Sequence, residues 1–162
     1  MPTAFLAYPA TLNRQKDGRY LVRFPDLPEA LTDGATREEA LQEAADCLSE
    51  ALAARIADGE PIPEPSPLRK RQYQVAPFPA IALKSALYDA MRSTDCSIAE
   101  LSRRLKVDHR EAQRLLDPRH PTKLPRMAEA LAVFGRHVAV AVFDTPRPGQ
   151  PIVSVDERQS AA

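Results

Sequence analysis

The start of the chain has a hydrophobic pattern with a period of two, which predicts β-strands. Apolar side chains alternate with others over residues 8–12 and over residues 20–24, as expected for strands with one buried face. Residues 16–18 between them contain Asp-Gly, a strong signal for a hairpin turn. The two prolines within residues 24–28 cannot donate to a central ladder of hydrogen bonds, so we expect this stretch to leave the sheet. Residues 30–33 then predict a short third strand.

From residue 36 the period lengthens to about 3.6 residues, which predicts one long helix over residues 36–58. Thr36 and Glu39 have the spacing of a capping box, and Gly59 is a typical helix stop. One apolar stripe is expected to pack on the hairpin, and it consists of Leu41, Ala44, Ala45, Leu48, Leu52 and Ile56.

Alternating prolines over residues 61–67 follow this helix and predict a stiff, extended segment. The segment is either a spacer that leads the chain back to the sheet or a docking site for a proline-binding domain. Residues 72–77 then suit a fourth strand. We therefore expect a first domain over residues 1–79, with the proline-rich segment inside it.

The remainder of the apolar pattern is mostly helical. Residues 81–92 and 124–135 each predict a helix, and residues 97–116 predict two short helices joined by a tight turn. Two short, basic helices in this order are typical of a helix-turn-helix, whose second helix enters the DNA major groove. A plain helical hairpin with a solvated basic surface is the alternative. In the turn, Lys106 must adopt a left-handed conformation that favours glycine, or the turn must be of a different type.

On the helix-turn-helix hypothesis, the polar side chains that point away from the helical core are the DNA contacts. Arginine can hold guanine, and glutamine can hold adenine, through paired hydrogen bonds. The candidates for base contacts are His109, Arg110, Gln113 and Arg114. The candidates for phosphate contacts, which position a protein without reading bases, are Ser97, Arg119, Thr122 and Lys123.

Residues 137–143 are strongly β-prone, and a single strand needs a partner. The partner is either the same strand of a second subunit, in a ribbon across a two-fold axis, or a strand of the same chain. In the first case Val138, Val140 and Val142 are the dimerisation residues. We expect a second domain over residues 80–143, followed by a mobile tail over residues 144–162.

The formal net charge of zero conceals an asymmetry between the two halves. Residues 1–65 carry 12 acidic and 6 basic side chains, a net charge of −6, whereas residues 66–143 carry 7 acidic and 14 basic side chains, a net charge of +7. A basic half can neutralise phosphates, and an acidic half suits a basic protein. The two domains are therefore expected to have different partners.

Composition argues against several other classes. With 44% hydrophobic and 27% charged residues the chain is globular, and no apolar run approaches the roughly 18 residues of a membrane span. The N-terminus lacks a basic segment before an apolar one, so we expect a cytoplasmic protein. Cys47 and Cys96 are expected to be reduced thiols, and no Cys/His spacing predicts a metal or cofactor site.

Several stretches resemble a known family. Residues 24–36, FPDLPEALTDGAT, with the following Glu39-Ala40 and the proline run 61–66, resemble the N-terminal domain of HicB-type antitoxins. The C-terminal half resembles the helix-turn-helix of one branch of that family, so the likeness extends over residues 8–143. It implies an α+β fold, with an N-terminal partial ribonuclease-H-like domain of β-β-β-α-β order. A C-terminal all-helical helix-turn-helix domain then ends in a dimerisation strand.

The resemblance implies an antitoxin with two partners. One is a HicA-like toxin, a small basic ribonuclease that cleaves mRNA and whose active site the antitoxin occludes. The other is the operator DNA of its own operon, which it represses as a homodimer or a tetramer. A ligand-responsive repressor without a toxin partner is the alternative.

A metal-dependent nuclease is a third hypothesis, and it would need clustered carboxylates. The candidates Asp17, Asp26 and Asp33 are better explained by turn chemistry, because Asp is favoured at turns and strand ends. We therefore expect no catalytic residues and no enzyme activity.

Overall fold

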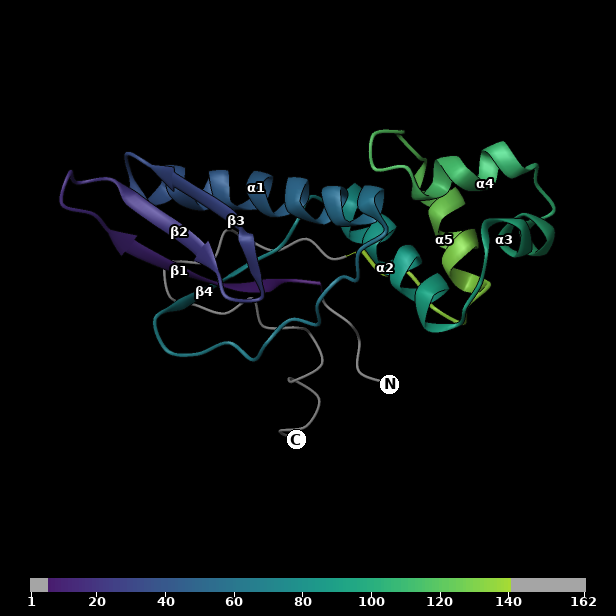
Figure 1. The fold of residues 1–162 in the computed structure, drawn as a ribbon, viewed down its shortest axis with the longest axis horizontal. Coiled ribbons are helices and arrows are strands. Elements are labelled where there is room, and N and C mark those ends of the chain that lie inside the picture. The colour runs from purple at the N-terminus through teal and green to yellow at the C-terminus, as the bar shows by residue number, and fades with distance from the viewer. Residues whose placement is uncertain (1–5, 141–162) are drawn as a thin grey trace.

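A computed structural model describes residues 6–140, which form a mixed α+β fold with one four-stranded sheet and five helices (Figure 1). Every neighbouring pair of strands is antiparallel, and the order across the sheet is β3-β2-β1-β4. All four predicted strands are present, as β1 Tyr8–Arg14, β2 Tyr20–Phe24, β3 Leu27–Gly34 and β4 Gln72–Val75.

The third strand starts earlier than the sequence predicted, because residues 24–28 do not leave the sheet. Only Pro25 and Asp26 form the turn, and Leu27 already pairs with Phe24 across a register shift in β2. Pro28 is therefore part of β3. Since β3 is an edge strand, the missing N–H of Pro28 can face away from the ladder without breaking a hydrogen bond.

Helix α1, Arg37–Asp58, begins and ends where the capping pattern placed its limits. The Glu39 N–H donates to Thr36 Oγ1 at 3.1 Å, and the Glu39 carboxylate accepts from the Ala35 N–H at 2.7 Å. At the other end Gly59 has φ 71°, a left-handed conformation in which glycine is not strained.

One face of the sheet is covered by α1 (Figure 1), and the first hydrophobic core lies between them. The predicted stripe is confirmed at four positions and corrected at its edge: Leu41 and Ala45 are only half-buried, whereas Ala40 is fully buried. Ala40 takes this place because the end of β3 approaches the helix backbone at Gly34. Each fully buried leucine in the stripe contributes about 1.5–3 kcal/mol. The buried α1 residues of this core are Ala40, Ala44, Leu48 and Leu52.

The proline-rich segment over residues 61–67 has no regular structure and is hydrogen-bonded to the sheet module. The buried Tyr8 hydroxyl donates to the Pro63 carbonyl at 2.7 Å, and the Ser66 N–H donates to the Asp26 carboxylate at 2.9 Å. These bonds hold the segment along the sheet before it enters β4, which is what the spacer hypothesis predicts.

Helix α2, Pro79–Ser93, contacts both halves of the molecule and lies beside the C-terminal end of α1 (Figure 1). Ile81 packs against the core of the sheet module, whereas Leu87 belongs to a second core among the later helices. The Tyr88 hydroxyl donates to the Glu60 carbonyl at 2.9 Å. The division into domains at residues 79 and 80 remains a prediction, and it falls at the start of a helix that the two halves share.

The later helices also match the predicted pattern, as α3 Ile98–Leu105, α4 His109–Leu116 and α5 Leu124–Ala132. The last helix ends before the predicted stop, and the chain turns at Gly135, which has φ 69°. Within the described ranges, no helix is long and apolar enough to cross a membrane. The second core consists of Leu87, Met91, Cys96, Leu101, Ala112, Leu115, Met127, Ala130 and Leu131.

The predicted strand over residues 137–143 is only partly described. Residues 137–140 form no strand within this single chain. Val138 is half-buried against the second core, and Val140 is 72% exposed. Val142 and the predicted tail lie outside the described residues, so a strand shared with a second subunit remains a prediction.

We expect Gly34→Ala to destabilise the protein by about 1–3 kcal/mol, because an added Cβ overpacks this contact. That atom would lie 2.4 Å from the Ala40 nitrogen and 2.7 Å from its Cα, both of which are backbone atoms that cannot swing away. Urea unfolding followed by circular dichroism measures the change. Ala35→Ser adds one atom at the next, exposed position and serves as the control. Equal midpoints for the two variants would contradict the argument.

Candidate nucleic-acid interface

Helices α3 and α4 each begin with a side-chain cap at the N-terminus. The Glu100 N–H donates to Ser97 Oγ at 3.1 Å, and the Glu111 N–H donates to Asp108 Oδ1 at 2.7 Å. Each cap satisfies an N–H group that has no partner inside its helix. Ser97 and Asp108 each stand three residues before a glutamate, and each helix begins directly after its capping residue.

The turn between them uses the first of the two conformations that the sequence left open for Lys106. This residue has φ 55° and ψ 45°, in the left-handed region that non-glycine residues rarely adopt. Its N–H donates to the Arg103 carbonyl at 3.2 Å, and the Ser102 hydroxyl donates to the Val107 carbonyl at 2.6 Å. These bonds close the turn around a strained residue.

Helix α4 buries one side and exposes the other. Ala112 and Leu115 are buried, and the opposite side is exposed along its length. In the described part of the chain, the side chains of this exposed side form no ion pair or hydrogen bond. They are the four candidates for base contacts, His109, Arg110, Gln113 and Arg114.

The arginines of α3 differ from those of α4 in their pairing. Arg103 and Arg104 both form ion pairs with Glu100 on the same helix. Hydrogen bonding to Arg104 and the positive charge of Arg103 lower the pKa of the Glu100 carboxyl. One carboxylate thus serves two arginines on α3, whereas the two arginines of α4 have no carboxylate partner within the described residues.

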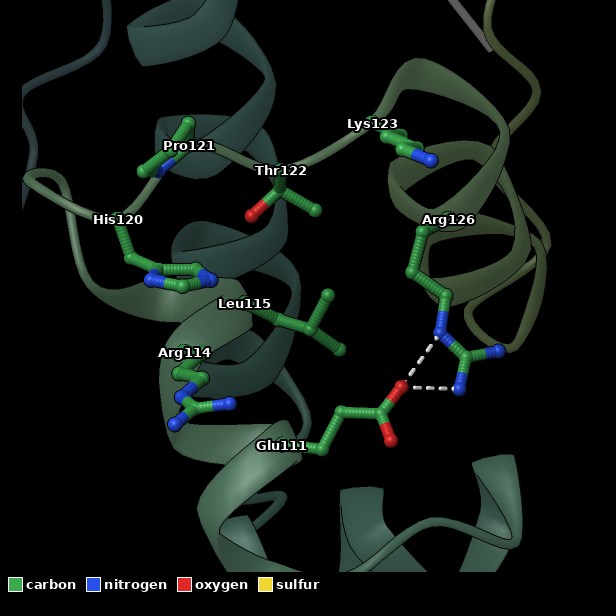
Figure 2. Close-up of a pocket in the computed structure, with 8 residues that line it drawn as sticks. All are labelled: Glu111, Arg114, Leu115, His120, Pro121, Thr122, Lys123 and Arg126. Carbon is green, nitrogen blue, oxygen red and sulfur yellow. Dashed lines mark hydrogen bonds and ion pairs between the residues drawn. The ribbon is translucent and has the colours of Figure 1, made fainter.

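Some of the phosphate candidates gather at a pocket between α4, the following loop and α5 (Figure 2). Thr122 and Lys123 line it together with Arg114. Ser97 is the cap of α3 and Arg119 is an exposed loop residue, and neither lines this pocket. The full lining is Glu111, Arg114, Leu115, His120, Pro121, Thr122, Lys123 and Arg126.

An ion pair fixes α5 against the first turn of α4. Arg126 donates through Nε and Nη2 to one carboxylate oxygen of Glu111, as Figure 2 shows, and through Nη1 to Glu129 at 2.6 Å. The hydrogen bonds from the guanidinium to Glu111 and Glu129 raise the pKa of Arg126. Arg126 is thus shared by two carboxylates, and within the described residues the cations of the pocket lining that form no ion pair are Arg114 and Lys123.

Sequence reasoning missed Lys84, a lysine of α2 that is only 1% exposed. Its Nζ donates to the Arg114 carbonyl at 3.1 Å, to the Leu115 carbonyl at 3.0 Å and to Thr122 Oγ1 at 3.1 Å. Burial lowers the pKa of this ammonium, and the Asp117 carboxylate opposes part of the shift. A signal was present, since Lys84 shares the apolar side of α2 with Leu87 and Met91.

The three carboxylates considered for catalysis lie in separate turns and strand ends. Asp17 accepts from the Arg19 N–H at 3.0 Å, Asp26 accepts from the Ser66 N–H and hydroxyl, and Asp33 forms an ion pair with Arg19. Within residues 6–140, no three His, Cys, Asp or Glu side chains are grouped so that they could hold a metal ion. The Asp17 contact is the local one expected from turn chemistry, whereas Asp26 and Asp33 are held by partners 40 and 14 residues away.

Comparison with known proteins gives one consistent family. A family model described as a HicB-like antitoxin of bacterial toxin–antitoxin systems matches residues 7–86. Antitoxin HicB 1 of Photorhabdus laumondii is 36% identical over 137 residues, which are 85% of this chain and 87% of the relative. Antitoxin HicB of Escherichia coli K12 is 34% identical over 137 residues, 85% of this chain and 99% of the relative. Antitoxin HicB of Pseudomonas fluorescens is 31% identical over 129 residues, which are 79% of this chain and 88% of the relative.

We expect Lys106→Gly to stabilise the protein by about 0.5–1 kcal/mol. Glycine relieves the left-handed strain of about 1–2 kcal/mol, but it also adds conformational entropy to the unfolded chain, which offsets part of the gain. Urea unfolding measures the difference. The control is Arg103→Gly inside α3. Glycine there should destabilise the protein by about 1 kcal/mol, because the backbone at this position is helical. A loss of stability in both variants would refute the role assigned to Lys106.

Proposed function

Because the chain belongs to the HicB family of antitoxins, we propose that it is a cytoplasmic protein with two binding activities. One activity occludes a HicA-like, mRNA-cleaving toxin. The other represses its own operon, through operator DNA bound by a dimer. The observation that carries the second activity is the exposed side of α4, whose arginines have no partner within the described residues.

In this proposal α3, its turn and α4 form a helix-turn-helix, with α4 as the helix that enters the major groove. Arg110 lies in the first turn of α4, where a recognition helix reaches base edges, and its guanidinium is exposed. The paired arginines of α3 and the unpaired ones of α4 support this orientation. Thr122 and Lys123 then face the phosphates that flank the groove.

Dimerisation places two such helices on one operator. The exposed Val140 and the absence of a strand over residues 137–140 in the single chain are compatible with pairing to a second copy. We propose that Val138, Val140 and Val142 form this contact, in a dimer or in a tetramer built from two dimers. The operator would then contain two half-sites about one helical turn apart.

The acidic half is proposed to bind the toxin. The outer side of α1 carries a row of exposed carboxylates that form no ion pair within the described residues, and such a row attracts a basic protein. In this proposal the β-β-β-α-β module is a partial ribonuclease-H-like scaffold used for binding and not for catalysis. The carboxylates of the row are Glu38, Glu43, Asp46, Glu50 and Asp58.

We expect Arg110→Ala to weaken specific operator binding by about 1–3 kcal/mol per half-site, because it removes a contact to a base edge. The measurement is an electrophoretic shift titration with the DNA upstream of this gene. Arg69→Ala removes an exposed arginine between the proline-rich segment and β4, and it is the control. If both variants bind like the unchanged protein, Arg110 is not a DNA contact.

We expect Glu50→Lys to slow association with the basic protein encoded beside this gene several-fold at low salt, and by less at high salt. Charges at the edge of an interface act mainly through the rate of association, and salt screens them. Surface plasmon resonance with immobilised toxin measures the association rate constant at low and at high salt. Asp95→Lys makes the same change of charge at an exposed position after α2. Identical rates for the two variants would place the toxin elsewhere on the molecule.

A further inference from the structure

The ammonium group of Lys84 lies where three segments meet, namely α2, the end of α4 and the loop before α5. Two of its three hydrogen bonds go to the carbonyls of Arg114 and Leu115, which are among the last carbonyls of α4 and have no partner inside the helix. A cation is favoured at this end of a helix by the helix dipole. Together with a third bond, to the loop before α5, these two bonds satisfy all three donors of the buried ammonium group.

The third bond goes to Thr122, and it determines which of the two groups donates the proton. An ammonium group has three donors and no acceptor, so Thr122 Oγ1 can only accept from Lys84. The proton of the Thr122 hydroxyl is therefore left for another acceptor. Among the described residues no acceptor receives it. Lys84 thus occupies one lone pair of Thr122 Oγ1 and leaves the hydroxyl proton free to donate to a further partner.

The surroundings of this hydroxyl suit an anion. Thr122 is half-buried and lines the pocket that also contains Arg114 and Lys123, both exposed (Figure 2). Glu111, the acidic residue of the lining, is already paired with Arg126. The lining cations that form no ion pair within the described residues, Arg114 and Lys123, therefore favour an anion beside this hydroxyl, and hydrogen bonds to charged groups are the stronger ones.

We propose that Lys84 is a positioning residue for DNA binding, which holds the Thr122 hydroxyl so that it donates to a phosphodiester oxygen of the duplex. The inference rests on the proposed operator binding and adds to it a residue that cannot itself touch DNA. It also separates two roles of Lys84: the carbonyl bonds stabilise the end of α4, and the bond to Thr122 serves the ligand.

The test is a double-mutant cycle with the full chain, in which fluorescence anisotropy measures the Kd for the DNA upstream of this gene. Thr122→Val keeps the shape but removes both the donor and the acceptor of the third Lys84 bond, and we expect it to raise Kd about tenfold, as for a lost hydrogen bond to a charged group. Lys84→Met should raise Kd to a similar extent. The double variant should bind no more weakly than Lys84→Met, because coupled residues are not additive. Lys70→Met, at an exposed lysine, is the control.

Thr122→Ser is a rescue variant that restores the hydroxyl, and its Kd should return close to that of the unchanged protein. If Lys84→Met is folded and binds normally, or if its effect simply adds to that of Thr122→Val, the inference is overturned. If Lys84→Met does not fold, the comparison of valine with serine at position 122 decides, and equal Kd values overturn the inference. An unchanged protein that fails to bind this DNA instead refutes the proposed operator binding itself.

Discussion

A buried ammonium group is the constraint on which the geometry of the C-terminal half depends. A charge taken out of water is tolerated only when all its hydrogen bonds are satisfied, and Lys84 has an acceptor for each of its three donors. Those acceptors belong to α4 and to the loop before α5. If either segment moved, a buried donor of Lys84 would lose its hydrogen-bond partner, which is unfavourable. The end of the proposed recognition helix and the proposed phosphate loop are thereby held in one arrangement relative to α2.

The same helix α2 joins this arrangement to the sheet. Besides Tyr88, the guanidinium of Arg92 donates at 2.9 Å to the carbonyl of Gly59, at the C-terminal end of α1, and the Phe78 N–H donates to Ser49 of α1. The acidic outer side of α1 and the basic outer side of α4 are consequently attached to one shared element. Two surfaces of opposite charge can then serve different partners on a chain whose formal net charge is zero.

Local rules in the sequence were sufficient for most of the elements and for the exposed side of α4. Capping residues such as Thr36 act within one helical turn, and the capping box at Thr36 and Glu39 predicted the start of α1 correctly. The spacing of Ala112 and Leu115 determined which side of α4 faces inward, and so which candidates for base contacts are exposed. At Lys106 the sequence allowed two turns, and the structure has the left-handed one.

Tertiary structure decided the features that depend on distant neighbours. Pro28 joins a strand because β3 is at the edge of the sheet, and edge position is a property of strand order rather than of the residue. Ala40 replaces Leu41 in the core because Gly34 approaches the helix backbone there. Lys84 reaches acceptors 30 to 38 residues away in the chain. Sequence pattern states how polar each position is, but only the packed chain determines whether a buried polar group finds its partners.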